Sequence, residues 1–312
     1  MAARPIIIDS DPGTDDAVAI WLALASPELE VLGITTVAGN VPLQLTSTNA
    51  RKVCELAGRS EAKVFAGCSR PMLRPLVTAE AFHGHDGLGN VPLPEPALPL
   101  QPQHAVDWLV ETLMAAGDGE ITLCPLGPLT NIALAIVKEP RILPRIREIV
   151  LMGGGFFAGG NTTPAAEFNI HVDPHAAQVV FTSGVPLVMM PLDVTHQALM
   201  TRERIAAVAA LDRPVPQAAA AMMTNYGTLD AERLDQHGGP LHDPCVIAYL
   251  LQPDLFAGRH CNVRIETASE ATMGMTVVDW WDVTDAPSNC QVMNEIDADG
   301  FFGLLTERLA QL

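Results

Sequence analysis

Positive charge is scarce in this 312-residue sequence, which has 18 Lys and Arg against 36 Asp and Glu, a formal net charge of −18 at pH 7. A surface this acidic repels phosphate backbones and anionic lipids. Nucleic acids and membrane surfaces are therefore not expected as partners, and neutral small molecules and cations stay open. Charged residues are also few, at 17%, against 48% apolar residues, which is enough for a large core and unlike a disordered chain.

Paired cysteines and long apolar runs are also lacking. The six cysteines are Cys54, Cys68, Cys124, Cys245, Cys261 and Cys290. None forms a C-x-x-C pair, so a zinc ribbon or thioredoxin-like chemistry has no support, and free thiols in a reducing compartment are expected. No run approaches the roughly 18 apolar residues of a membrane span, and the first residues do not read as a signal peptide. We therefore expect a cytoplasmic protein.

Short apolar runs alternate with segments of helical period over the first 190 residues. Strands are expected at 5–8, 31–37, 63–66, 121–124, 146–152 and 186–190, and helices at 15–25, 44–57, 105–116, 129–137 and 174–183. This alternation predicts an α/β fold with a mostly parallel central sheet flanked by helices. Residues 70–103 are expected to be irregular, and the pattern after about residue 200 is more helical. No linker or repeat interrupts the chain, so a single domain over 1–312 is expected.

Polar residues follow the ends of several expected strands. Asp9 and Asp11 follow the first, Asn40 the second, Leu126 the run ending in Cys124, and a glycine-rich stretch leading to Asn161 the run ending in Met152. Parallel α/β sheets bind ligands beyond the carboxyl ends of their strands. These residues are therefore expected to face a common site.

Four carboxylates stand within eight residues, at Asp9, Asp11, Asp15 and Asp16. A helix that begins here accounts for Asp15 and Asp16, because carboxylates favour the positive end of a helix. It does not account for Asp9 and Asp11. Clustered carboxylates repel one another unless a cation or a proton neutralises them, and hard divalent cations prefer oxygen ligands. The cluster therefore predicts a metal site.

Three better-known loops do not match. An EF-hand counted from Asp9 would need Glu at position 20, where the chain has Ile20. A phosphatase motif of the form D-x-D-x-[TV] fails at Gly13. The glycines 153–155 lack both G-x-G-x-x-G and GK[ST] spacing, so they are not a nucleotide-binding loop and instead let the backbone approach a ligand.

The segment Asp9-Ser-Asp-Pro-Gly-Thr-Asp-Asp-Ala-Val-Ala19 resembles the N-terminal signature of the inosine–uridine nucleoside hydrolase family. Six further motifs follow in family order: Val37-Ala-Gly-Asn40, His83-Gly84 with Gly87-Leu-Gly89, Gly127-Pro-Leu-Thr-Asn131, Met152-Gly-Gly-Gly155, Ala166-Glu-Phe-Asn169 with Asp173-Pro174, and Leu241-His-Asp-Pro244. The resemblance spans residues 5 to about 250. It implies an N-glycosyl hydrolase that depends on calcium and cleaves ribonucleosides of the inosine, uridine and cytidine type to ribose and free base. It also implies the nucleoside hydrolase fold, with a Rossmann-like core, and a homo-oligomer, a tetramer or a dimer.

The resemblance also assigns the metal and the acid–base chemistry. It implies that Asp11, Asp16, Asp243 and the backbone carbonyl of Leu126 hold Ca²⁺. Asp11 would in addition act as general base toward the attacking water. His242 would be the acid that protonates the leaving base, since imidazole titrates near neutral pH.

By the same resemblance, a further set of residues holds the substrate, mainly through the ribose hydroxyls. The set is Asp15, Asn40, His83, Asn161, Glu167 and Asn169. Asn and Glu place donors and acceptors at set angles. Glu167 and Asn169 are two apart, so on an extended segment they would share a face.

The sequence does not decide which residues contact the base, nor which base is preferred. The resemblance implies that Tyr226 faces the base, because the family places aromatic residues before its His-Asp-Pro motif. Asp230 stands where some family members have an aromatic residue or an amide. His85 has no assigned role. Trp280 and Trp281 are expected to pack in the core.

Two alternative functions remain. One is a hydrolase of another N-riboside, such as nicotinamide riboside. The other is a non-catalytic nucleoside- or calcium-binding protein on the same scaffold. The presence of the full set of acidic residues and of His242 favours an enzyme.

Overall fold

The computed structural model describes residues 3–234 and 238–312, with side chains described outside 227–237. Within these residues, eight strands form one sheet in the order β3-β2-β1-β4-β5-β6-β10-β7, and β8 and β9 form a small antiparallel hairpin. All neighbours in the large sheet are parallel except β10 and β7. The strands are β1 (Arg4–Ser10), β2 (Leu29–Thr36), β3 (Val64–Ala66), β4 (Ile121–Pro125), β5 (Ile146–Met152), β6 (Leu187–Met190), β7 (Phe256–Cys261), β8 (Val263–Ile265), β9 (Thr276–Val278) and β10 (Cys290–Ile296).

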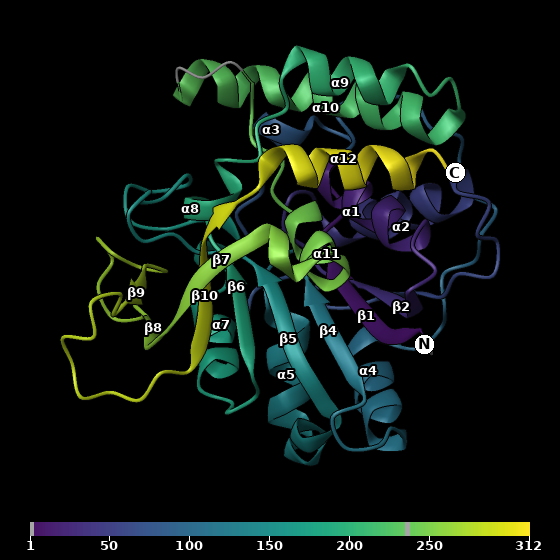
Figure 1. The fold of residues 1–312 in the computed structure, drawn as a ribbon. Coiled ribbons are helices and arrows are strands. Elements are labelled where there is room, and N and C mark those ends of the chain that lie inside the picture. Colours follow the sequence, from purple (N-terminus) through teal and green to yellow (C-terminus); the bar gives the residue numbers. More distant parts are fainter. Residues whose placement is uncertain (1–2, 235–237) are drawn as a thin grey trace.

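Helices cover both faces of this sheet (Figure 1). They are α1 (Thr14–Leu24), α2 (Leu43–Leu56), α3 (Glu80–His83), α4 (Ala105–Ala115), α5 (Thr130–Lys138), α6 (Phe168–Val172), α7 (Pro174–Phe181), α8 (Leu192–Thr195), α9 (Arg202–Ala209), α10 (Pro214–Leu234), α11 (Pro244–Leu251) and α12 (Ala298–Leu309), with 3₁₀ turns at Pro140–Arg145 and Pro253–Leu255. Helices α4, α5 and α7 pack in one layer, and α1, α2, α11 and α12 pack in the other. No helix in the described residues is long and apolar enough to cross a membrane.

The central strand β1 shows why the sheet is buried on both sides. Ile6 and Ile8 pack in the core beneath α1 and α11, and Ile7 packs in the opposite core beneath α4 and α5. All three are fully buried. A strand covered on both faces needs a continuous apolar run rather than an alternating one, and the Pro5–Ile8 run meets that need.

The predicted alternation over the first 190 residues is confirmed, and element ends differ by at most two residues. The irregular stretch at 70–103 holds one short helix, α3. The carboxyl-terminal half differs more from the sequence reading, because β7 and β10 extend the large sheet and β8 and β9 form the hairpin. These strands are three to seven residues long and carry weaker patterns than the amino-terminal ones.

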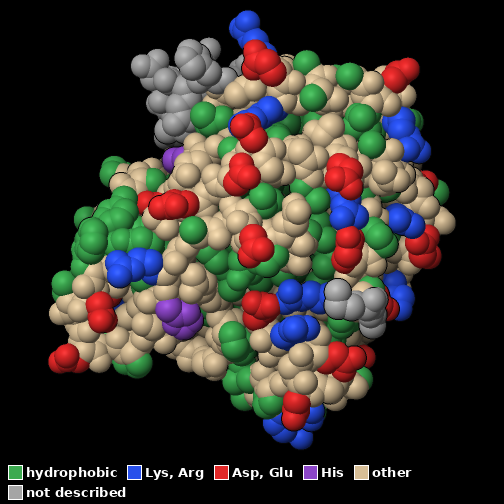
Figure 2. Space-filling model, in the orientation of Figure 1, with side chains coloured by type: hydrophobic (Ala, Val, Ile, Leu, Met, Phe, Trp, Pro, Cys, Tyr) green, Lys and Arg blue, Asp and Glu red, His purple; other side chains and the backbone are tan. Residues whose placement is uncertain are grey.

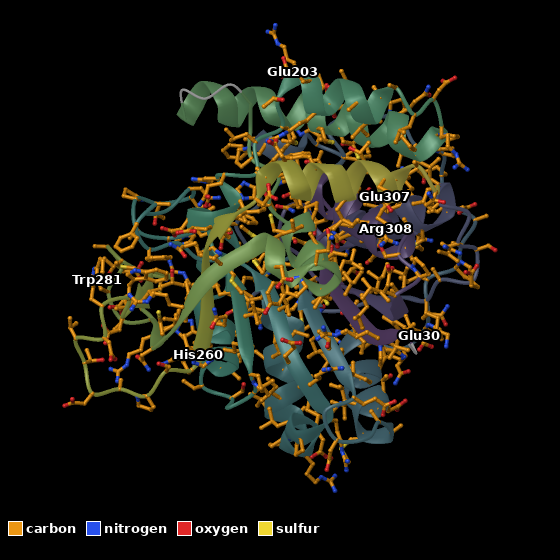
Figure 3. All side chains as sticks on the ribbon, viewed as in Figure 1. Glu30, Glu203, His260, Trp281, Glu307 and Arg308 are labelled. Atoms are coloured by element: carbon orange, nitrogen blue, oxygen red, sulfur yellow. The ribbon has the colours of Figure 1, made fainter. Side chains whose placement is uncertain are left out.

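The prediction that Trp281 packs in the core is wrong. Trp281 follows β9 and is 70% exposed, and Phe157 and Val283 are exposed as well. Trp280 stacks on Phe156, with ring centroids 5.1 Å apart. This apolar patch is visible at the left of Figure 2, and Figure 3 shows Trp281 pointing outward there. The tryptophans lie beyond the strand, so the alternation of strand faces does not apply to them.

Candidate active site

The site is built at the carboxyl end of the parallel strands. In the sheet register Asp9 pairs with Thr35 of β2 and with Pro125 of β4. The turns that follow these strands are thereby brought together, and they carry Asp11, Asn40 and Leu126. This is the edge of the sheet where the sequence reading placed the site.

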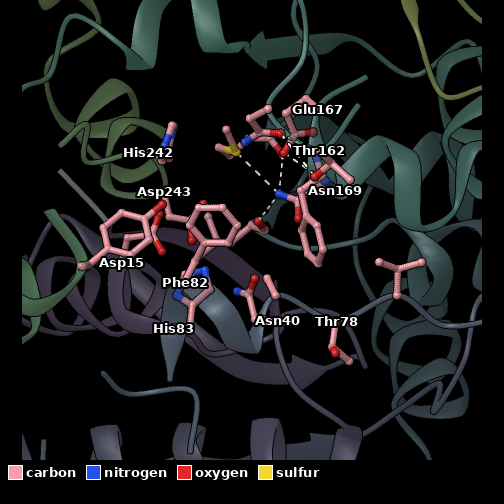
Figure 4. Close-up of a pocket in the computed structure, with 17 residues that line it drawn as sticks. Asp15, Asn40, Thr78, Phe82, His83, Thr162, Glu167, Asn169, His242 and Asp243 are labelled. Carbon is pink, nitrogen blue, oxygen red and sulfur yellow. Dashed lines mark hydrogen bonds between the residues drawn. The ribbon is translucent and has the colours of Figure 1, made fainter. Parts of the chain in front are cut away.

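One cavity gathers most of the predicted residues (Figure 4). Its lining includes Asp15, Asn40, His83, Leu126, Asn161, Glu167, Asn169, His242 and Asp243. Asp11 and Asp16 do not line it. They are fully buried next to it. Asp11 accepts a hydrogen bond from the backbone N–H of Asn40, and Asp16 accepts one from the Asn40 side-chain amide.

Three carboxylates of the site come close enough to share a cation. Oxygens of Asp15, Asp16 and Asp243 all lie within 4.8 Å of one another. Burial and the neighbouring charges of Asp15, Asp16 and Asp11 raise the pKa of Asp243 well above its ordinary value. Buried carboxylates this close together need a proton or a cation to neutralise them, and their oxygens are donors of the kind that Ca²⁺ prefers. Among carboxylates, the group differs from the predicted one in two ways: it includes Asp15, which the resemblance assigned to ribose, and it does not include Asp11.

Asp11 is buried close to these carboxylates and is held by a hydrogen bond from the backbone. Its Oδ2 accepts a hydrogen bond from the backbone N–H of Asn40 at 2.6 Å. Its Oδ1 is buried and has no hydrogen-bond partner among the described residues. Burial and the charges of Asp16 and Asp15 raise the pKa of Asp11 well above its ordinary range. An orphaned carboxylate oxygen of this kind calls for a cation, a water or a proton, so Asp11 fits the predicted metal set.

Asp16 confirms part of the helix-start interpretation. Its Oδ2 accepts from the backbone N–H of Gly13 at 2.9 Å, which caps α1, and its Oδ1 accepts from Ser10 at 2.6 Å. The Nδ2 of Asn40 donates to the same Oδ2 at 3.1 Å. Asp16 therefore stabilises the start of the helix and also belongs to the acidic group.

Asp9 orients its neighbours from inside the sheet. Its Oδ1 accepts from the Thr35 hydroxyl at 2.5 Å and from the Asn131 amide at 2.8 Å. Complete burial raises its pKa to about 7 despite these bonds. The bonds join β1, β2 and α5 directly below Asp11.

The asparagines of the cavity differ in what they can still offer a ligand. Asn40 donates from Nδ2 to the Asp11 carbonyl and to Asp16, and Asn169 donates from Nδ2 to the carbonyls of Leu126 and Met152. No donor among the described residues reaches the Oδ1 of either side chain, so this acceptor is left for a ligand. Asn161 is the reverse, because its Oδ1 accepts from the backbone N–H of Phe168. Its amide N–H groups are left for a ligand, so the cavity presents both acceptors and a donor.

Glu167 is held by backbone N–H groups. Its oxygens accept from Gly154, Asn169 and Ile170 at 2.9 to 3.2 Å, so it caps α6. Complete burial raises its pKa to about 7 even so. Glu167 and Asn169 would share a face only on an extended segment, and that condition is not met, because α6 begins at Phe168. Capping by Glu167 outweighs the absence of a helical pattern in so short a segment.

His83 stands on α3 against the start of α1. Its Nδ1 accepts from the backbone N–H of Thr14 at 3.2 Å, which places the proton of the neutral ring on Nε2. Its ring stacks on Tyr226, with centroids 5.0 Å apart. Burial lowers the pKa of His83 to about 4, so the ring is neutral near pH 7.

His242 lies near the same aromatic wall. Its Nδ1 is 2.7 Å from the Thr195 hydroxyl, and its ring contacts those of His196 and Tyr226 edge-on. Burial, with the neighbouring His196 and His83, lowers its pKa well below the ordinary value. The imidazole is therefore held neutral and in a fixed orientation.

Several lining residues were missed by the sequence reading, among them Thr78, Phe82, Met152, Thr162 and Phe168. Phe82, Thr162 and Phe168 are direct neighbours of predicted residues, and that adjacency is a signal that could have found them. Tyr226 lines the cavity as expected. The side chain of Asp230 lies outside the described residues, and His85 is 95% exposed beside Glu80.

Comparison with known proteins agrees with this geometry. The family model described as inosine-uridine preferring nucleoside hydrolase matches residues 6–303. A protein of Photobacterium profundum named pyrimidine-specific ribonucleoside hydrolase RihA is 47% identical over 309 residues, covering 99% of each chain. Among solved structures, the plant nucleoside hydrolase PpNRh1 superposes with a TM-score of 0.91 at 33% identity, covering 98% of this chain and 99% of its own. A purine-preferring ribonucleoside hydrolase from Gardnerella vaginalis gives 0.92 at 32%, covering 98% of each.

The parallel sheet, with an acidic cavity at its carboxyl edge, is therefore that of an N-glycosyl hydrolase. More particularly, this chain belongs to the inosine-uridine preferring nucleoside hydrolase family, and ribonucleosides are the class of substrate that it hydrolyses.

Proposed function

We propose that this chain is a calcium-dependent hydrolase of ribonucleosides that cleaves uridine and cytidine ahead of inosine. The observation that carries the proposal is the cavity itself. Asp15 and Asp243 line one end of it, with Asp16 of the same acidic group buried behind them, and the amides of Asn161 and Asn169 line its wall. Such a cavity suits a ligand that carries several neutral hydroxyl groups.

The described residues fit a divalent cation, because buried oxygens converge and Asp11 Oδ1 has no partner among them. Asp11, Asp16, Asp243 and the carbonyl of Leu126 would hold it. When bound, calcium would neutralise the carboxylates, orient ribose hydroxyls and lower the pKa of a water molecule.

The chain's own residues would carry the proton transfers. In hydrolysis, water adds at C1′ of the ribose while the C1′–N bond breaks and its electron pair leaves with the base. Asp11 takes the proton from that water as general base. His242 acts as the acid toward the departing base, and Thr195 at Nδ1 holds the ring so that Nε2 meets it. Because burial lowers the pKa of His242 and keeps the ring neutral in the free cavity, the ring would first take up a proton from solvent and then pass it to the departing base. The lowered pKa makes that protonated ring a stronger acid.

The ribose would be held by the remaining polar groups of the cavity. Asn40 and Asn169 offer acceptors, and Asn161 offers donors, to the hydroxyls. The carboxylate of Glu167, which caps α6, would accept one further hydrogen bond from a ribose hydroxyl. Asp15 would accept a hydrogen bond from a ribose hydroxyl next to the acidic group. These bonds select a sugar of fixed shape rather than a charged ligand.

The base would lie against the stacked rings of His83 and Tyr226. The Nε2–H of His83 then provides a donor close to the sugar or the base. The preference for pyrimidines rests on the 47% identical relative, whose name specifies them, against 32% for the relative named as purine-preferring.

The test is ribose release from uridine, cytidine, inosine, adenosine, guanosine and nicotinamide riboside, before and after thorough removal of metal. We expect release that falls on metal removal and returns with calcium, with uridine and cytidine fastest. Faster cleavage of nicotinamide riboside would transfer the proposal to that N-riboside. Tight nucleoside binding without release from any of them would indicate a binding protein.

We also propose that the chain forms a homo-oligomer, a dimer or a tetramer, and that it works in the cytoplasm. The exposed patch around Phe157 and Trp281 supports an oligomer, because large apolar patches mark interaction surfaces. Light scattering coupled to size exclusion would give the mass, and a monomer at micromolar concentration would overturn this part.

A further inference from the structure

The segment that follows β5 carries part of the cavity wall but has little structure of its own. Residues 153–166 supply Asn161 and Thr162 to the cavity and lead directly to Glu167. Five of them are glycines, and Gly154 and Gly159 have φ values of +81° and +74°. Backbone of this kind has great conformational freedom. It needs anchors from elsewhere if Asn161 is to hold one position.

The structure provides these anchors as side chains from three separate places. Five consecutive backbone N–H groups, from Gly154 to Ala158, each donate to a side-chain oxygen. Glu167 accepts the first of them, and Asp193 of α8 accepts the last three at 2.8 to 2.9 Å.

The remaining anchor, Thr276, comes from β9, 121 residues further along the chain. Its Oγ1 accepts from the Gly155 N–H at 2.9 Å and donates to the Gly155 carbonyl at 2.6 Å. The side chain is 1% exposed. Its methyl group fills the space beside Gly154, where an added Cβ would lie 2.8 Å from Cγ2. Both branches of the threonine are therefore used, and the hydroxyl satisfies both polar groups of one peptide residue.

From this geometry we infer that Thr276 is a positioning residue for nucleoside hydrolysis, acting through residues 153–166 on Asn161 and Glu167. It does not line the cavity and so does not touch the substrate. The inference rests on the proposed function, in which Asn161 and Glu167 hold the ribose. In this arrangement the β8–β9 hairpin is a support for the sugar site.

The hydroxyl can be separated from the methyl group by substitution. Thr276→Val keeps the shape and removes the hydrogen bonds, and Thr276→Ser keeps the hydroxyl. Thr306→Val is the matched control, because the Thr306 hydroxyl donates to the carbonyl of Phe302 in α12, outside the cavity lining. We expect Thr276→Val to lower kcat/KM for uridine about tenfold, mainly through KM, because two buried polar groups lose their partner. Thr276→Ser and Thr306→Val should stay within threefold of the native chain.

A double-mutant cycle shows whether Thr276 acts through the ribose-binding segment. In an Asn161→Ala background, Thr276→Val should cost less than threefold, because the group that it positions is already gone. An equal loss in both backgrounds would overturn the inference, and so would an equal loss in Thr276→Ser and Thr276→Val.

Hydrogen exchange tests the anchoring without relying on turnover. Amides of residues 154–158 should exchange at least tenfold faster in Thr276→Val than in the native chain or in Thr306→Val. Unchanged exchange would refute the inference even if the native chain hydrolyses nucleosides. Faster exchange in a chain that releases no ribose would instead refute the proposed function, while the anchor stands.

Discussion

A single methyl group added at Gly127 should disable the site without unfolding the protein. A Cβ built on Gly127 would lie 2.1 Å from Oδ1 of Asp11 and 2.7 Å from its Cγ, whereas ordinary contact begins at 3.4 Å. The carboxylate cannot turn away, because Gly39 packs closely against its other oxygen. The closeness of that contact is shown by a Cβ built on Gly39, which would lie 2.0 Å from Oδ2. Asp11 must therefore move by about 1 Å, a displacement that commonly costs about 100-fold in rate.

The assay is ribose release from uridine with saturating calcium, together with calcium titration by calorimetry. Gly127→Ala should lower kcat/KM by about 100-fold and weaken calcium binding. Overpacking should lower the free energy of unfolding by about 1 to 3 kcal/mol, which leaves the chain folded. Gly303→Ala is the control, because its Cβ meets nothing within 4 Å and it lies inside helix α12. That change should keep full activity and gain up to about 1 kcal/mol of stability.

Retention of native kcat/KM by Gly127→Ala would refute the reasoning, since it would mean that the position of the Asp11 carboxylate does not limit the reaction. Loss of activity in Gly303→Ala as well would point to a general sensitivity of the fold. Gly127 is not among the positive-φ glycines, so backbone strain does not confuse the comparison.

Other outcomes follow from the same site. Asp11→Asn should lower kcat for uridine by about 10³-fold through loss of the general base, yet raise the Tm of the metal-free chain, because one buried charge is removed; unchanged kcat would reject the base assignment. The pKa values of Asp11 and Asp243 are raised in the folded state. In the metal-free chain their ionisation therefore lowers the free energy of unfolding. This loss is absent below about pH 4 and grows as pH rises. Scanning calorimetry should therefore find a larger gain in Tm from calcium at pH 8 than at pH 5, and an equal gain would contradict this. Uridine 5′-monophosphate should be hydrolysed at least 100-fold more slowly than uridine, because the acidic group repels phosphate, and comparable rates would exclude that effect.

The amino-terminal half of the fold could be predicted because each apolar run has one structural solution. A run such as Pro5–Ile8, followed by Asp and Gly, is read as a buried strand and a turn. Parallel order then brings the turn residues to one edge. The predicted grouping of Asp15, Asn40 and His242 in one cavity needs no more than this rule and the family motifs.

The rest depended on contacts between distant segments. The pairing of β10 with β6 and β7, and the exposed position of Trp281, are set by long-range packing that short segments do not encode. Helix α6 exists because Glu167 caps it, and its five residues are too few for a periodic pattern. The division of donors and acceptors among the asparagines likewise depends on partners from other turns.

The six cysteines are all free and buried, and they are spread over both layers and both ends of the sheet. Burial raises the pKa of every one of these thiols, to about 12 for Cys54, Cys68 and Cys124. An alkylating reagent at neutral pH can therefore react with them only when the surrounding structure opens. The native chain thus contains its own set of unfolding reporters. The order in which Cys261 of β7 and Cys124 of β4 become labelled would reveal whether the antiparallel edge of the sheet opens before its centre.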